Sequence, residues 1–268
     1  YSLTAAPDTF TGNSGDDTFV AAVANSWSTA DSIDGVSGTD TFSITAAGAV
    51  AAPVGASVKN IDTATVTTTG TVSLNTTTWT GLTSLTSTGA GSGALTASAT
   101  TDVVNTSTLL VAGAGNEVAI SGGNNVTSTS TDTQVLGTAS ASNIVVGGAA
   151  TAAPAGTVTV THTETGTDAA GNTTSTGASL TVTGGTSITT TYNLVELGTS
   201  DNAGDDLTAG ATTITGNAST TTVSATQTAA AARTANGAAL INGAVAISDA
   251  NAASTTKAGS ITDVTVSS

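Results

Sequence analysis

Short runs in which β-branched residues occupy every second position recur along the whole chain. A period of two puts alternate side chains on opposite faces of an extended strand, so these runs predict β-strands. The clearest runs are 61–69 (IDTATVTTT), 157–165 (TVTVTHTET), 180–183, 220–226 and 261–266. The one segment rich enough in Ala to favour a helix, 225–239, contains an Asn-Gly pair, and we expect it to be a loop or a short helical turn.

Glycine and asparagine corners separate these runs, for example at 115–116, 122–125 and 184–185. Large apolar residues are scarce, because aromatics make up 3% of the chain and Ala supplies much of the 38% hydrophobic share. The narrow interior of a solenoid suits small side chains, since each coil is ordered by the next. We therefore predict an all-β chain folded as a right-handed parallel β-roll or β-helix. A string of antiparallel β-sandwiches is the rival, disfavoured by the lack of bulky core aromatics.

The charge balance excludes several functions. The chain carries 18 Asp and Glu against three Lys and Arg, for a net charge of −15. Without a basic stripe to neutralise phosphates, we expect no binding to nucleic acid or to anionic lipid.

No apolar stretch reaches the roughly 18 to 20 residues of a membrane span. The chain has no Cys, and it starts at Tyr1 without any Met, so we expect a processed product or a piece of a longer protein.

Residues suited to acid–base or nucleophilic catalysis are also scarce, and we predict that the protein is not an enzyme. The one imidazole, His162, lies in an alternating Thr-rich run, where we expect it to face solvent as a strand residue. A polysaccharide-active β-helix enzyme would need carboxylates with Arg or Lys beside them on one face. The lone Arg233, in an Ala-rich segment, argues against that alternative.

Two stretches near the start of the chain repeat one construction. The frames 12–20 and 35–43 match the nonapeptide G-G-x-G-x-D-x-U-x at three fixed positions and at the aromatic position U. Both depart at the second Gly, where Asn13 and Val36 stand. Glycine permits a left-handed backbone that exposes carbonyl oxygens, and Asp adds a hard anionic oxygen, as Ca²⁺ prefers. These features predict turns that bind calcium.

Spacing indicates how the two turns meet. Asp17 and Asp40 are 23 residues apart, two nonapeptides plus about five extra residues, so the turns are expected to stack on one side of the roll and to hold Ca²⁺ between them. Asp8 and Asp31 lie in the preceding strands, where they would close the same site or its neighbour. The alternative is a pair of polar turns with solvated Asp. The candidate ligands in this region are Asp8, Asn13, Gly15, Asp17, Asp31, Gly35, Ser37, Gly38 and Asp40.

A second acidic loop, 196–206, contains a Gly-Asp-Asp sequence like that of the first turn. It either binds calcium or is a solvated loop. Its candidate ligands are Asp201, Asp205 and Asp206.

The domain organisation follows from this distribution. We assign residues 1–45 to calcium-binding β-roll coils and residues 46–268 to a Thr/Ala/Gly-rich β-solenoid. Inserted loops are expected at about 162–206 and 225–240.

The chain resembles the calcium-binding RTX-type S-layer proteins of Gram-negative bacteria. The resemblance depends on the turns at 8–21 and 31–42 and on the segments 58–89, 177–190, 215–228 and 242–266. It implies a secreted β-solenoid whose calcium ions rigidify turns and join copies of the chain into a two-dimensional lattice on the cell. It also implies type I export and attachment to lipopolysaccharide through a separate region, neither of which is recognisable in this sequence. The segment 165–210 is longer and more polar than the family pattern.

We therefore expect a structural S-layer protein that assembles through calcium-bridged loops at the cell surface. The alternative is a stalk or ligand-binding segment of a secreted RTX adhesin or antifreeze-like protein, because Thr-x-Thr runs can present flat arrays of hydroxyl groups. Regular ranks of Thr at one fixed coil period would support that alternative, and the sequence shows no constant period.

Overall fold

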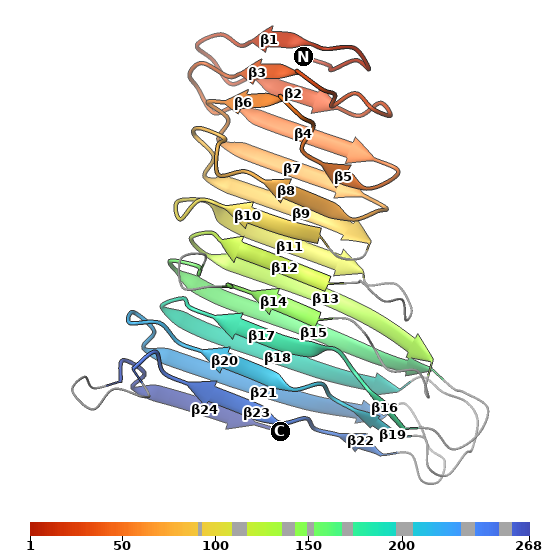
Figure 1. Ribbon diagram of the computed structural model, residues 1–268, viewed down its shortest axis with the longest axis vertical. Helices are drawn as coiled ribbons and strands as arrows, with labels where there is room; N and C mark the ends of the chain where they lie inside the picture. The colour runs from red at the N-terminus through yellow and green to blue at the C-terminus, as the bar shows by residue number, and fades with distance from the viewer. Residues whose placement is uncertain are drawn as a thin grey trace.

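The computed structural model describes residues 1–90, 93–108, 117–135, 143–148, 153–167, 174–196, 206–231, 239–251 and 259–268. Within these ranges every regular element is a β-strand, and none is a helix that could cross a membrane. The chain winds in successive coils, and each new coil lies against the previous one from the N-terminal end to the C-terminal end of the molecule (Figure 1). The prediction of an all-β fold is confirmed.

Two long sheets face each other along this stack (Figure 1). The ten-stranded sheet, called the long sheet below, consists of β2 (Thr18–Ala21), β4 (Thr41–Ala46), β7 (Thr63–Thr68), β9 (Ser84–Ala90), β11 (Asp102–Thr108), β13 (Val126–Val135), β15 (Thr157–Thr167), β18 (Ser187–Glu196), β21 (Thr222–Ala231) and β24 (Asp263–Ser267). The eight-stranded sheet consists of β5 (Val50–Ala51), β8 (Val72–Asn75), β10 (Gly93–Ala97), β12 (Glu117–Gly122), β14 (Asn143–Val146), β17 (Ser179–Thr183), β20 (Thr212–Thr215) and β23 (Val245–Ser248).

Two three-stranded sheets complete the coils. One belongs to the N-terminal end, with β1 (Thr9–Thr11), β3 (Ser32–Asp34) and β6 (Ser57–Lys59). The other belongs to the C-terminal end, with β16 (Thr174–Thr176), β19 (Asp206–Thr208) and β22 (Leu240–Ile241). Every described strand pair is parallel, for instance β13 with β15. The rival prediction of antiparallel sandwiches is therefore wrong, because hairpin-linked strands would pair antiparallel.

The coils differ in length, yet their strands stay in register. Ser84 pairs with Asp102 across a short coil, whereas Thr222 pairs with Asp263 across a coil about twice as long. Parallel ladders fix which residues face each other, so the register is kept while both the strands and the segments between them lengthen, from 7 residues in β9 to 10 in β21. The stack consequently widens toward its C-terminal end (Figure 1).

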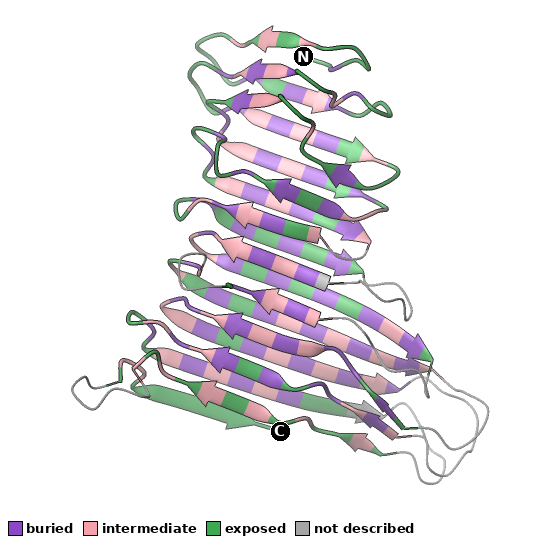
Figure 2. Cartoon of the chain, viewed as in Figure 1, coloured by how far each residue is buried: buried purple, intermediate pink, exposed green. Residues whose placement is uncertain are grey.

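The core lies between the two long sheets and follows the period-two pattern. Buried and more exposed residues alternate along nearly every strand of the long sheet (Figure 2). In the N-terminal coils Phe42 is completely buried, and its ring lies 5.7 Å from the Trp27 ring and 5.8 Å from the Trp79 ring. Few aromatics are needed because the interior is thin.

Strands occupy much of the sequence that we expected to be loops. The segment 162–206 contains the end of β15, all of β16, β17 and β18, and the start of β19. Residues 225–231 belong to β21, which corrects the expectation of a loop or helical turn there, and 232–238 lie outside the described residues. Thr runs satisfy the strand period even where Ala is frequent. β4 crosses residue 45, so the division into 1–45 and 46–268 marks a change in composition within one continuous sheet.

Candidate functional site

The two predicted turns stack directly on each other. β1 pairs with β3 and β2 pairs with β4, and the interval between partners is the same in both pairs, as for Thr9 with Ser32 and Thr18 with Thr41. The turns 12–17 and 35–40 connect these strand pairs and therefore occupy equivalent places in consecutive coils. The stacking predicted from the spacing of Asp17 and Asp40 is thus present.

Aspartate side chains link consecutive coils at this corner. The backbone N–H of Asp17 donates to Asp40 Oδ1 at 2.8 Å, and the backbone N–H of Asp40 donates to Asp62 Oδ2 at 2.8 Å. Asp17 and Asp40 are almost fully buried. The carboxylates of Asp40 and Asp62 thereby each bind the backbone of the preceding coil, and we call Asp17, Asp40 and Asp62 the aspartate column.

Each turn also forms a small cradle of oxygen atoms at its first glycine. A Cβ on Gly12 would lie 2.4 Å from Asp17 Oδ2 and 2.7 Å from the Gly35 carbonyl oxygen. A Cβ on Gly35 would lie 2.3 Å from Asp40 Oδ2 and 2.2 Å from the Asn60 carbonyl oxygen. In both coils a carboxylate of the same turn and a carbonyl of the next coil border a space that only glycine leaves open. We call these two places the Gly12 cradle and the Gly35 cradle.

The cradles contain donors that suit calcium. Ca²⁺ takes six to eight oxygen ligands at about 2.3–2.6 Å, drawn from carboxylates, backbone carbonyls and water. Asp40 Oδ2 is buried and accepts no hydrogen bond, which is costly for a carboxylate oxygen unless a cation or water is near it. Among the described residues no three His, Cys, Asp or Glu side chains gather as a metal cluster. A bound ion would therefore rely on carbonyls and water as well as on the carboxylates.

The other predicted turn residues shape the loops. Asn13 donates to Asp17 from its backbone N–H at 2.6 Å and from Nδ2 at 3.0 Å, and its Oδ1 accepts the Gly15 N–H at 2.7 Å. Gly38 has φ +124°, and a Cβ on it would lie 2.5 Å from the Gly15 carbonyl oxygen. Ser37 is exposed, and its backbone N–H donates to the Gly35 carbonyl.

Val36 stands where the nonapeptide has its second Gly, and it has φ +74°. A left-handed backbone is strained for a β-branched residue. The conformation of this turn therefore matches the motif even where the residue does not.

Asp8 and Asp31 form a second, separate pair. The backbone N–H of Asp8 donates to Asp31 Oδ1 at 2.8 Å, and Asp31 also accepts the Ser28 N–H. This pair precedes β1 and β3, whereas the Gly12 and Gly35 cradles follow them. Four residues of extended chain span roughly 13 Å, so Asp8 and Asp31 do not close the same site as Asp17 and Asp40.

Part of the second acidic loop lies beyond the described structure. Asp201 and Asp205 fall outside the described residues. Asp206 begins β19, and its Oδ1 accepts the Ala239 N–H at 2.9 Å. This contact links two coils, as the aspartate column does at the other end of the molecule.

The sequence reasoning missed the third coil. Asn60 supplies a carbonyl to the Gly35 cradle and has φ +51°, and Asp62 extends the aspartate column. Neither residue lies in a Gly-rich nonapeptide. The available signal was the spacing, because the interval from Asp40 to Asp62 nearly equals the interval from Asp17 to Asp40.

His162 does not face solvent as expected, but lies completely buried inside the solenoid. Its Nδ1 is 2.9 Å from Ser130 Oγ, and its Nε2 is 3.2 Å from Glu164 Oε2. His162 and Glu164 share the strand phase of the buried Val158 and Val160, which places all four on the inner face. In the sequence, the alternate positions of Val158 and Val160 already indicate which face of the strand is buried.

The Ser130, His162 and Glu164 contacts have the order of a nucleophile, a base and an orienting acid. Such a group acts only on a substrate that reaches the serine. All three side chains are completely buried, so we interpret them as a structural network in the core.

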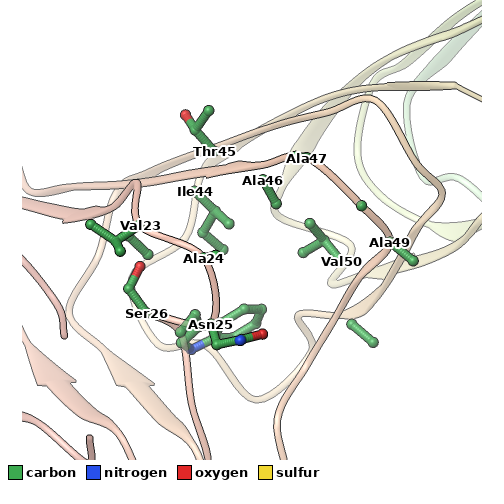
Figure 3. A pocket seen from close by; sticks show the side chains of 14 residues that line it. Val23, Ala24, Asn25, Ser26, Ile44, Thr45, Ala46, Ala47, Ala49 and Val50 are labelled. Carbon is green, nitrogen blue, oxygen red and sulfur yellow. The ribbon is translucent and has the colours of Figure 1, made fainter. Parts of the chain in front are cut away.

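A cavity of about 230 Å³ lies beside the first coils. Figure 3 shows Val23, Ala24, Asn25 and Ser26 on one side of it, with Ala46, Ala47, Ala49 and Val50 across from them. The first group belongs to the segment between β2 and β3, where the sequence is longer than a regular half-coil. The lining includes no acid, base or other titratable side chain, so the cavity is separate from the predicted calcium ligands.

Gly35→Ala should destabilise the protein by about 1–3 kcal/mol, because its methyl group would overlap the Asn60 carbonyl and the Asp40 carboxylate. Thermal or denaturant unfolding followed by circular dichroism measures the effect. Gly48→Ala is the matched control, since a Cβ there meets nothing within 4 Å, and it should change stability by no more than about 0.5 kcal/mol. Equal stability of the two variants would contradict the crowded geometry of the Gly35 cradle.

Comparison with known proteins adds no relative: no protein-family model matches the sequence, and neither does any curated protein.

Proposed function

We propose that the protein is a secreted structural protein of a bacterial S-layer, which assembles into a two-dimensional lattice when Ca²⁺ fills its turns. One observation carries the proposal: the same cradle of carboxylate and carbonyl oxygens occurs in two consecutive coils, at Gly12 and at Gly35. The parallel stacking of the coils supports a β-roll, and we take its hand to be right-handed because parallel crossovers almost always are.

Charge gives the proposal its mechanism. The net charge of −15 makes copies of the chain repel each other. Each bound Ca²⁺ cancels two negative charges, and an ion shared by loops of two copies converts repulsion into adhesion. With only three Lys and Arg in the chain, few cations compete with the metal for carboxylates. Anchoring to lipopolysaccharide would belong to a region other than this one.

Assembly in defined cations tests this function. The purified chain should form ordered sheets, visible by negative-stain electron microscopy, in millimolar CaCl₂. EDTA should dissolve them and renewed CaCl₂ should restore them. MgCl₂ should be a poor substitute, because Mg²⁺ demands a tighter octahedral site. Sheets that persist in EDTA, or particles that stay monomeric in CaCl₂ while binding the metal, would refute a calcium-assembled lattice.

A further inference from the structure

The outer face of the long sheet carries two unbroken ranks of residues, nearly all with hydroxyl groups. They lie at alternate positions of each strand from β4 to β24, side by side with their register partners. The first rank is Ser43, Thr65, Thr86, Val104, Thr127, Thr159, Thr189, Ser224 and Thr265. The second rank is Thr45, Thr67, Thr88, Thr106, Thr129, Thr161, Thr191, Thr226 and Ser267. Among these described positions only Val104 lacks a hydroxyl group.

The ranks form although the coils vary in length. We expected such an array to require a constant coil period. That expectation is wrong, because the register of the parallel strands aligns these residues however many residues lie between the strands. Neighbours along a rank are separated by about 4.8 Å, the distance between strands. The two ranks are separated by about 6.6 Å, two residues along a strand. The strands run nearly parallel to one another in Figure 1, so the ranks keep one direction along the stack.

These side chains are available to solvent. All of them are exposed or half-buried, whereas the residues between the two ranks are buried in every strand except β24, where Val266 is exposed. The one hydrogen bond formed by their hydroxyl groups within the described structure joins Thr226 to Ser267 at 3.0 Å. Neither rank contains a charged or aromatic residue, although the chain has 18 acidic residues. The two ranks are therefore a neutral, periodic array of hydroxyl and methyl groups, and the exposed Asp102 and Asp263 lie beside the first rank on β11 and β24.

We infer that this face binds ice. A growing ice surface is a flat, neutral lattice of water oxygens that repeats on a scale similar to both spacings of the array. Hydroxyl groups fixed at such intervals hold water molecules in matching positions, and methyl groups between them favour the ordered layer over bulk water. A charged face would instead orient water around its ions. The inference does not depend on the S-layer function.

Two other occupants fit the face less well. A polysaccharide is usually held by aromatic side chains that stack on its sugar rings, and the two ranks have none. An interface between two copies of a chain usually has a core that is richer in aromatic and apolar groups than this array of hydroxyl groups. Both remain distinguishable outcomes of the experiment.

Partition into ice tests the inference. The fluorescently labelled protein, in calcium-containing buffer, should be enriched in a slowly grown ice hemisphere, and thermal hysteresis should be measurable. The double variant Thr129→Tyr/Thr161→Tyr places two bulky rings in the middle of the second rank. It should fall to the incorporation of an inert protein such as serum albumin.

Thr213→Tyr is the matched control, because Thr213 is exposed on β20 of the eight-stranded sheet. It should retain full ice incorporation, and circular dichroism should show the same fold and similar melting temperatures for all three proteins. Exclusion of the unaltered protein from ice would overturn the inference. So would equal loss in both variants, or a double variant that changes only the sedimentation coefficient or the binding to an insoluble polysaccharide.

Discussion

Glu164→Ala should lower the free energy of unfolding by about 3–5 kcal/mol, because it removes the shared acceptor of a buried hydrogen-bond network and leaves its partners unsatisfied. Glu164 Oε2 lies 3.2 Å from His162 Nε2 and accepts the Ala178 N–H at 2.8 Å. Tyr192 OH lies 3.3 Å from the same oxygen. Without the carboxylate the Ala178 N–H loses its acceptor and His162 Nε2 loses its partner, while Tyr192 OH keeps only the Ala178 carbonyl as an acceptor. Since domains are stable by only about 5–15 kcal/mol, the loss should be obvious in chemical denaturation.

The Tyr192 hydroxyl depends on the same network. Burial, and then the charge of Glu164, raise the pKa of Tyr192 far above its usual range. The hydroxyl is therefore a permanent donor, close to Glu164 and to the Ala178 carbonyl at 3.0 Å. The network joins β15, β18 and the segment before β17, so its loss affects the contact between both long sheets.

Two variants keep this prediction falsifiable. Glu164→Gln retains the size and one acceptor oxygen, so it should be less destabilising than Glu164→Ala. Thr159→Ala changes an exposed residue of the same strand and should shift stability by no more than about 0.5 kcal/mol. If Glu164→Ala unfolds like Thr159→Ala, the buried network does not contribute as its geometry indicates.

Local patterns predicted several of the strands. The runs 157–165 and 180–183 correspond to β15 and β17, and 261–266 corresponds to β24. Alternation involves only neighbouring residues, so it can be recognised in a single sequence. The pairing of the strands was harder to predict, because the coil lengths are unequal and a search for a fixed period therefore does not find the register.

The inner face was harder to assign than the strands. Thr can face either water or a narrow core, so a Thr-rich run does not show which of its two sides is buried. His162 was misplaced for this reason, since its polarity was weighed above the phase of Val158 and Val160. The interior also accepts the polar Ser128 and Gln134, both completely buried. Polarity alone is a weak guide inside this solenoid.

The two stacked turns were predictable where the motif has both Gly and Asp. Gly12, Gly35 and the two aspartates occupy equivalent corners, as the spacing of the aspartates predicted. The contribution of Asn60 was not predictable from the motif, because a backbone carbonyl can come from any residue type. Geometry, rather than residue identity, brings that oxygen to the Gly35 cradle.

Calcium should raise the stability of the N-terminal coils substantially, and chelation should remove the gain. At a free Ca²⁺ concentration of about 100 times Kd, one site contributes about 2.7 kcal/mol, and two cradles would contribute about twice that. The physical reason is that Asp40 Oδ2 is buried without a hydrogen bond, so the folded protein gains an interaction that the unfolded chain lacks. Thermal unfolding in CaCl₂ and in EDTA, monitored by Trp27 and Trp79 fluorescence, measures the difference.

Asp40→Asn isolates the role of the carboxylate charge. The amide oxygen can still accept the Asp17 N–H, so the link between coils is retained while the charged ligand is lost. This variant should lose the contribution of the Gly35 cradle, about half of the calcium-dependent rise in melting temperature, and bind fewer ions by isothermal titration calorimetry. Asp263→Asn makes the same charge change at an exposed position of β24 and should keep the full rise. A calcium response in Asp40→Asn equal to that of Asp263→Asn would show that the Gly35 cradle is not where the ion binds, because any general screening of the net charge of −15 affects both variants alike.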